Sequence, residues 1–187
     1  MHEKIRIRTK TLYSWILITI LILILYIFKR ELFDITFLKS FVNDNRLMVI
    51  TIYLIILSLI GLLFIPSTPF AIAGVILFSP GEAYILNLIG IITSSTIVYY
   101  FTQYLRLNKW IESRFPEKTI KVREALKKKV LPIIAGWSFF PIVPTDLIIY
   151  VASTLSIPYW KCVLGVLIGE GILNAFYIFS IDLLIGL

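Results

Sequence analysis

Two pairs of prolines, with the members of each pair three residues apart, interrupt the two longest apolar stretches of the chain. The first pair is Pro66 and Pro69, and the second is Pro141 and Pro144. A proline removes a backbone donor and blocks helix continuation, and apolar surroundings offer the freed carbonyls no water. The sequence therefore predicts helices that break at these points, with the irregular backbone buried in protein or lining a cavity.

The composition places these breaks in a membrane. Hydrophobic residues make up 59% of the 187 positions, compared with about 45–50% in soluble domains. The single cysteine, Cys162, excludes a disulfide within the chain, and the only histidine is His2. Metals bound by His or Cys and histidine-based catalysis are therefore not expected. We expect an integral membrane protein that is not an enzyme and carries no metal or cofactor.

Residues 11–28 form the first apolar stretch, preceded by four Lys or Arg residues and followed by Lys29 and Arg30. These 18 residues would rise about 27 Å as a helix, enough to cross a bilayer with little tilt. No small-residue cleavage site follows them, which argues against a secretory signal. We interpret residues 1–46 as a retained N-terminal membrane anchor helix and its connection.

The two proline-broken stretches are residues 47–80 and 130–158, and each is followed by an unbroken apolar stretch, 83–105 and 159–185. The lead-in before Pro141 has 11 residues, too few to cross about 30 Å of hydrocarbon. A hairpin that enters the membrane, breaks and returns to the same side fits both broken stretches. For the lead-in to the first break, a full span remains open.

These assignments give an all-α integral membrane fold. It has three spanning helices plus two opposed re-entrant helical hairpins that form an inverted repeat. Proline-broken segments at matching places in two halves of a chain are typical of a transporter's binding site, so we expect a transport domain over residues 47–187. It divides into repeat 1 at 47–105, a basic interfacial segment at 106–129 and repeat 2 at 130–187.

An offset of 75 residues superimposes the two proline pairs and extends beyond them. Between residues 61–101 and 136–176, eight of 41 positions are identical, against about three or four expected by chance in so biased a composition. The identical pairs are Gly61/Gly136, Phe64/Phe139, Pro66/Pro141, Pro69/Pro144, Tyr84/Tyr159, Gly90/Gly165, Ile97/Ile172 and Phe101/Phe176. Because prolines and glycines match in register without a gap, we interpret the two halves as an internal repeat.

Positive charge predicts the orientation of the chain. Residues 106–129 hold nine Lys or Arg and three Glu, and short basic loops stay in the cytoplasm. With this segment and the N-terminal tail inside, the two hairpins enter from opposite leaflets. We therefore expect a multi-pass plasma-membrane protein with a cytoplasmic N-terminus. The basic segment fits a helix on anionic lipid as well as a solvated loop, and we expect no nucleic-acid binding.

Two acidic residues are predicted deep in the membrane, where an ionisable group is a candidate for function. Glu170 lies 11 residues after Tyr159, about 16 Å along a helix. Its structural alternative is a protonated carboxyl hydrogen-bonded between helices. Asp146 follows the second proline pair, where capping of the returning half-helix is an equally good explanation. Low dielectric disfavours the charged form of a carboxyl, so both are candidates for proton coupling, whereas Glu82 at a helix start is expected to be structural.

The half-helices that begin after the breaks are predicted to bind an anion. Unpaired N–H groups at a helix start, together with the helix dipole, attract phosphate or carboxylate. Hydroxyl groups near the breaks add further donors. The candidate substrate-binding residues are Pro66, Thr68, Pro69, Pro141, Pro144 and Thr145.

The segment from Phe139 to Tyr150, with its P-x-x-P motif, resembles the core of the DedA family, also called the SNARE-associated or VTT-domain family. The segment from Pro66 to Gly74 resembles the upstream P-x-x-P … A-G element of that family. The Tyr-Tyr pair at 99–100, with Gln103, resembles the end of the helix that follows. Together these motifs cover roughly residues 60–180, which is most of the chain.

The resemblance implies two opposed re-entrant hairpins and transport of lipid, as a flippase or scramblase of phospholipid or of a polyprenyl-phosphate carrier. It implies membrane lipids with an anionic headgroup as partners and leaves proton coupling open. Where the family often has Arg, this chain has Gln103, and residues 137–140 before the second proline pair carry no charge. The half-helix ends are therefore expected to hold an anion without an arginine clamp.

Two functions of other classes remain open from the sequence. One is a non-transporting scaffold for membrane or envelope assembly, and the other is a proton- or cation-coupled transporter of a small solute. Assembly into a homo-oligomer also remains open.

Overall fold

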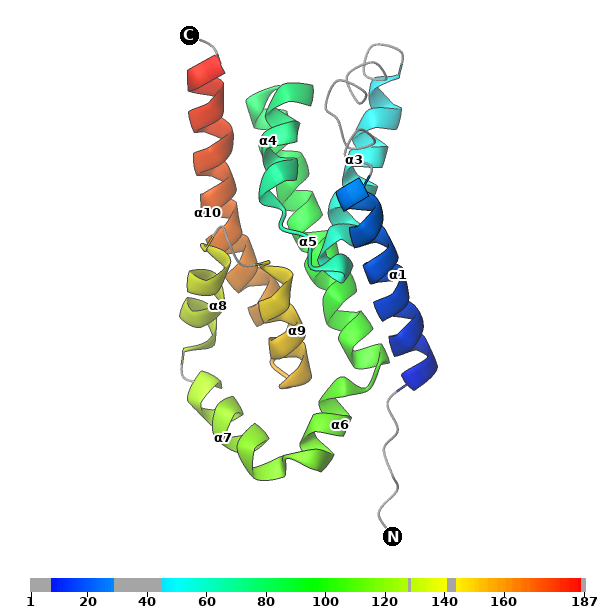
Figure 1. Ribbon diagram of the computed structural model, residues 1–187. Coiled ribbons are helices and arrows are strands. Elements are labelled where there is room, and N and C mark those ends of the chain that lie inside the picture. The colour runs from blue at the N-terminus through cyan, green and yellow to red at the C-terminus, as the bar shows by residue number, and fades with distance from the viewer. Residues whose placement is uncertain (1–7, 29–44, 128, 141–143, 186–187) are drawn as a thin grey trace.

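The computed structural model describes residues 8–28, 45–127, 129–140 and 144–185 of the chain. Every regular element in these ranges is a helix, as the sequence predicts (Figure 1). In chain order the elements are α1 (Thr9–Phe28), α3 (Arg46–Ile60), the 3-10 helix η2 (Gly61–Leu63), α4 (Thr68–Leu77), α5 (Pro80–Tyr104), α6 (Leu107–Arg114), α7 (Pro116–Lys127), α8 (Val130–Ser138), α9 (Asp146–Thr154) and α10 (Tyr159–Ile185).

Helices α3 and α4 form a pair whose outer ends lie at the same end of the molecule (Figure 1). Arg46 at the start of α3 makes a 2.6 Å ion pair with Glu82 in the first turn of α5, which directly follows α4. At the inner end, Gly61 lies so close to Ser94 of α5 that an added Cβ would clash with it. Because Ser94 is well inside α5, the chain turns back beside the middle of that helix. The ion pair gives Glu82 the structural role that its position predicts.

Helices α8 and α9 form a second pair that extends from the opposite end (Figure 1). The pair starts directly after the basic helices α6 and α7, and it returns to them. The Nε atom of Arg123 in α7 donates a 2.7 Å hydrogen bond to the carbonyl of Leu155, at the end of α9. The same guanidinium forms an ion pair with Glu112 of α6. Both outer ends of the α8–α9 pair are therefore held at the α6–α7 end of the molecule.

The two long helices, α5 and α10, pack against each other and against both pairs. Glycines let the helices approach closely. A Cβ on Gly90 of α5 would lie 2.7 Å from Leu57 of α3, and one on Gly165 of α10 would lie 2.8 Å from Ile134 of α8. In a membrane, where no hydrophobic effect drives helix association, such close backbone packing is the main source of attraction.

Three helices of the described chain are long and apolar enough to cross a membrane: Arg46–Leu63, Pro80–Tyr104 and Tyr159–Ile181. The last two correspond to predicted spanning stretches. The first lies in the stretch for which a full span was left open, and its 18 residues meet the length requirement for crossing. In the predicted anchor helix α1, the part with described side chains that counts as an apolar helix is Thr9–Leu21. This part is shorter than the three candidate spans.

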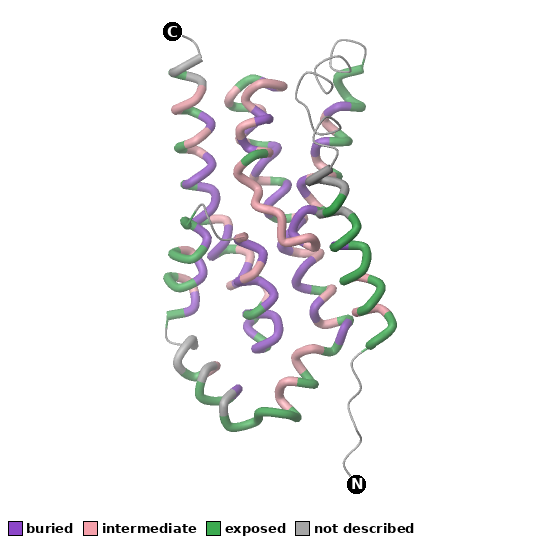
Figure 2. Tube along the Cα trace, viewed as in Figure 1, coloured by how far each residue is buried: buried purple, intermediate pink, exposed green. Residues whose placement is uncertain are grey.

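The distribution of polarity is that of a membrane protein. Large apolar side chains face outward, such as Phe176 and Ile172 of α10, which are 68% and 58% exposed. Polar side chains such as Asn87, Ser95 and Glu170 are instead almost fully buried. Figure 2 shows the buried residues concentrated on α5, α9 and α10, whereas α1 is largely exposed. Buried polar side chains thus lie where the α3–α4 pair meets the α8–α9 pair.

Candidate functional site

The first break ends α3 through successive departures from α-helical geometry. The helix tightens into η2, Phe64 adopts a left-handed backbone with φ 56°, and Pro66 has no N–H to donate. Ser67 then begins α4, because its carbonyl accepts from the amides of Phe70 and Ala71 at 2.9 and 3.0 Å. The hydroxyl of Ser67 makes no capping bond to α4, which leaves it available to another helix.

The second break leads into α9 at Thr145 and Asp146. The amide of Leu147 donates to the carbonyl of Pro144 at 3.1 Å, which starts the helix. Thr145 makes no side-chain capping bond. The Oδ1 atom of Asp146 accepts a 3.0 Å hydrogen bond from Ser94 of α5. The carboxyl of Asp146 is therefore engaged by a neighbouring helix as well as standing at a helix start.

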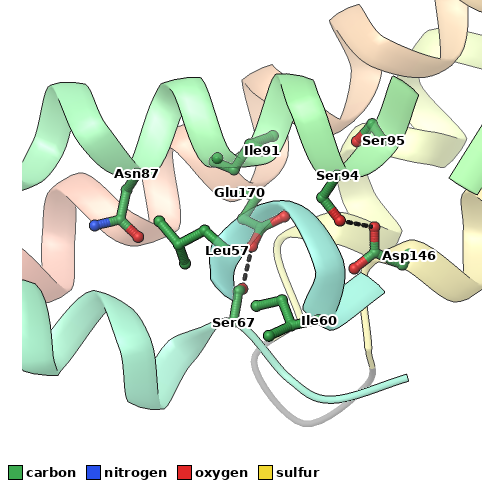
Figure 3. A pocket seen from close by; sticks show the side chains of 10 residues that line it. Leu57, Ile60, Ser67, Asn87, Ile91, Ser94, Ser95, Asp146 and Glu170 are labelled. Carbon is green, nitrogen blue, oxygen red and sulfur yellow. Dashed lines mark hydrogen bonds between the residues drawn. The ribbon is translucent and has the colours of Figure 1, made fainter. Parts of the chain in front are cut away.

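Glu170 of α10 lies where the two half-helices begin. The hydroxyl of Ser67, at the start of α4, donates a hydrogen bond to Glu170 Oε1. Thr145, immediately before α9, lines a small cavity together with Ser67 and Glu170. Glu170 is 4% exposed and Asp146 is 8% exposed. Figure 3 shows the Ser67–Glu170 and Ser94–Asp146 hydrogen bonds in one view, so the two buried carboxyls belong to one polar site.

Two cavities of about 10 Å³ each share Ser67 and Glu170 as lining residues. That volume is about the size needed to hold one water molecule. The first is lined by Leu57, Ile60, Ser67, Asn87, Gly90, Ile91, Ser94, Ser95, Asp146 and Glu170. The second is lined by Pro66, Ser67, Thr68, Phe140, Thr145, Glu170 and Leu173. The site is thus closed around water-sized spaces, with the Ser67–Glu170 contact common to both.

The chemistry of the site is that of carboxyls and hydroxyls. The residues that line the two cavities include no Lys, Arg or His. Within the described parts of the chain, no group of three or more His, Cys, Asp or Glu is placed to hold a metal. Such a site can take up and release protons at its carboxyls. It can also offer hydroxyl and helix-start N–H donors to an oxyanion.

The predicted site residues are brought together in part. Thr145 and Pro66 line the second cavity with Glu170, while Asp146 and Glu170 line the first. Pro69 lies in the first turn of α4 and is exposed rather than part of either cavity. Three further predicted residues complete the set: Thr68 lines the second cavity, Pro144 is half-buried directly before Thr145, and Pro141 lies outside the described residues. Their roles in binding and proton coupling remain predictions.

Sequence reasoning missed three residues at this site. Ser94 was missed because a serine inside an apolar helix carries no signal until its neighbour is known. Gly61 was recognised only as part of the repeat, although a Cβ there would clash with both Ser94 and Asp146. Trp15 lies within the predicted anchor, where the sequence marks no individual residue, yet its Nε1 donates a 2.9 Å hydrogen bond to the carbonyl of Leu62 at the first break.

Comparison with protein families identifies the domain that carries this site. A model of the VTT domain matches residues 65–183, from the first break to near the end of α10. The chain belongs to the VTT-domain family. This is the domain of the DedA and SNARE-associated membrane proteins, so the family suggested by the sequence motifs is confirmed.

The VTT match contains every cavity-lining residue of α4, α5, α9 and α10, including both buried carboxyls. Helices α1 and α3 precede it. VTT-domain membership, together with the three apolar helices, makes this a membrane protein of a transporter-like family. No curated protein and no solved structure matches the chain.

Proposed function

We propose that this protein moves lipid across the membrane, as a flippase or scramblase of phospholipid or polyprenyl phosphate. The observation that carries the proposal is the convergence of two half-helix starts, at Ser67 and Thr145, on the buried carboxyl of Glu170. Broken helices that meet inside a membrane domain are the usual setting of a transport site. The protein then acts on lipid without chemical conversion, so it is not an enzyme.

The proposal treats the α3–α4 and α8–α9 pairs as re-entrant hairpins. Support comes from the ends of each pair: Arg46 binds Glu82 at one end of the molecule, and Leu155 binds Arg123 at the other. Support also comes from the turning point beside Ser94, because a helix that crossed fully would pass the middle of α5. Irregular backbone at membrane depth is tolerated where it is buried in protein or lines a cavity.

The two hairpins and the long helices that follow them are proposed to be inverted repeats. Gly90 of α5 and Gly165 of α10 stand 75 residues apart. Each packs against the first arm of its own hairpin, at Leu57 and Ile134 respectively. Repeats that enter from opposite leaflets place their breaks at a common depth, where alternating access can take place around one site.

An anionic headgroup is the proposed substrate of the converged helix starts. An ionised Glu170 and a phosphate would repel each other in this low-dielectric site. We therefore propose that headgroup entry goes together with proton uptake by Glu170 and Asp146. With two water-sized cavities, the present state is closed, and the Ser67–Glu170 hydrogen bond must open for a headgroup to enter. The proposed location is the plasma membrane, and basic charge at 106–129 supports an orientation with this segment and the N-terminus in the cytoplasm.

Reconstitution tests the proposal. Purified protein is placed in vesicles that contain phospholipids labelled at an anionic or at a zwitterionic headgroup. A membrane-impermeant quencher removes the signal of the outer leaflet at once, and the further loss of signal, from inner-leaflet lipid that moves outward, is then followed. Translocation faster than in empty vesicles, and faster for the anionic lipid, supports the proposal. Vesicles that behave like empty ones, in the presence and absence of a pH gradient, would sink lipid transport and favour a scaffold. Proton flux that follows an added solute instead of lipid would favour solute transport.

A further inference from the structure

We propose that Trp15 of α1 is a positioning residue for the first helix break, which makes α1 a working part of the transport domain. The inference rests on the proposed function only where its test measures lipid translocation. Its structural basis is a hydrogen bond that links α1 to a carbonyl left without its helical partner. The VTT match begins at residue 65, so this contribution comes from outside the matched domain.

The carbonyl of Leu62 loses its helical partner because of Pro66. In an α-helix, the carbonyl of residue 62 would accept from the N–H of residue 66, and a proline has none. The indole Nε1 of Trp15 donates to this carbonyl at 2.9 Å, and the hydroxyl of Tyr150 lies at 3.5 Å from it. Since an unpaired carbonyl is costly away from water, the indole N–H fills the position that the proline leaves empty.

The ring of Trp15 also packs against the strained part of the break. Phe64 has a left-handed backbone, a conformation that bulky residues adopt only when their surroundings hold them in it. The Trp15 ring centroid lies 5.6 Å from that of Phe64, 5.6 Å from that of Phe101 and 5.8 Å from that of Tyr150. The Phe64 and Tyr150 rings are themselves 4.8 Å apart. Rings from α1 and α9 therefore contact Phe64, and Phe101 of α5 packs against Trp15 in turn.

This cluster connects the first break to the second. Tyr150 lies four residues after Asp146 on α9, so the two side chains project from the same face of that helix. Trp15, Phe64 and Tyr150 thus join α1, the end of α3 and the half-helix that carries Asp146. If the Trp15 hydrogen bond is lost, the Leu62 carbonyl keeps only the more distant hydroxyl of Tyr150, at 3.5 Å. The backbone of the break then shifts relative to α9.

The rest of α1 is lightly attached, which argues that the contact has a specific purpose. Ile16, Leu17, Ile18 and other described side chains of α1 are exposed, as its tube in Figure 2 shows. A second contact lies at the N-terminal end of α1, where the Arg8 guanidinium is 3.9 Å from the Tyr104 ring centroid. A simple anchor would need neither an indole N–H aimed at a broken backbone nor an aromatic cluster around it.

The test compares Trp15→Phe, which keeps a ring but removes the N–H, with Trp160→Phe as the matched control. Trp160 is 57% exposed on α10 and lies outside the cavities. Hydrogen exchange of residues 60–67 in reconstituted protein should speed up in Trp15→Phe by roughly three- to tenfold and stay unchanged in Trp160→Phe. The maximal rate of lipid translocation per folded protein should fall in Trp15→Phe with little change in half-saturation.

The outcomes separate this inference from the proposed function. If wild-type protein moves no lipid, the proposed function fails, while the exchange measurement still decides the role of Trp15. Equal exchange over residues 60–67 in Trp15→Phe and wild type would overturn the inference. If Trp15→Phe does not fold, wild-type protein carries the test through the indole N–H itself. The Nε1–H of Trp15 should exchange with solvent far more slowly than that of Trp110, which is 37% exposed on α6, and equal exchange of the two indoles would overturn the inference.

Discussion

The hydroxyl of Ser67 donates a hydrogen bond to the carboxyl of Glu170 across 103 residues of chain. Ser67 stands at the start of a half-helix, and Glu170 lies inside the long helix α10. The contact joins the first helix pair to the second half of the chain, between two water-sized cavities. It is therefore the point that must open if anything larger than water is to occupy the site.

Ser67→Ala should expose Glu170 to reaction. Without the hydroxyl, the carboxyl loses a donor, which costs about 1–3 kcal/mol for a buried group, and the two cavities gain room at their common wall. Labelling of Glu170 by a hydrophobic carbodiimide, read by mass spectrometry, should be roughly fivefold faster than in wild type. Labelling of Asp146, which bonds to Ser94 instead, should change little. Equal labelling of Glu170 in both proteins would argue against Ser67 as the closing contact.

Ser94→Ala should lower stability through Asp146. The Asp146 carboxyl is 8% exposed and accepts its 3.0 Å hydrogen bond from Ser94, so removing the donor should cost about 1–3 kcal/mol. In an Asp146→Asn background the same serine change should cost less, because a neutral amide depends less on that donor. Thermal unfolding of the four proteins in detergent measures the coupling. Strictly additive effects would show that the two side chains do not interact.

Gly61→Ala should destabilise the protein, whereas Gly136→Ala should not, although the two glycines match in the repeat. A Cβ at Gly61 would overlap Ser94 and Asp146, while one at Gly136 meets nothing within 4 Å. Overpacking of this kind costs about 1–3 kcal/mol. Gly136 lies within α8, where alanine is a better helix former by roughly 0.5–1 kcal/mol. Unfolding midpoints should therefore move in opposite directions, and a parallel shift would contradict the close approach at Gly61.

Arg123→Gln should loosen the outer end of α9. The guanidinium bridges the Leu155 carbonyl and Glu112, and a cation at a helix C-terminus contributes about 0.3–1 kcal/mol. Faster hydrogen exchange at the end of α9, with Arg114→Gln as an exposed control on α6, is the expected result. Exchange that is unchanged by Arg123→Gln would mean that α9 is held by its packing alone.

The sequence predicts the break points well because proline acts locally. The first break stands at Pro66, and α9 starts just after Pro144, where the missing donors require it. It also predicts that Glu170 and Asp146 are buried, because an acidic residue inside an apolar membrane stretch faces the protein interior and not the lipid. The partners of these residues escape prediction because they are set by packing. Nothing in the local sequence indicates that Ser94 faces Asp146 or that Trp15 reaches Leu62.

The spanning assignment shows the same limit. Residues 46–63 are apolar and long enough to cross, so length alone does not separate a spanning helix from a hairpin arm. The proposed hairpin is supported instead by the ion pair of Arg46 with Glu82 and by the close approach of Gly61 to Ser94. Both are contacts between segments that lie more than thirty residues apart. The hairpin reading rests on these contacts.

The proposed transport site is tested by lipid translocation in Glu170→Gln, measured beside wild type in the same vesicles with equal amounts of folded protein. Glutamine keeps the shape and a hydrogen-bond acceptor for Ser67 but can neither ionise nor carry the exchanged proton. We expect that translocation driven by a pH gradient is lost in Glu170→Gln, while any slow, gradient-independent scrambling falls less. Wild-type rates in the variant, with and without the gradient, would contradict a transport site at the meeting point of the two breaks.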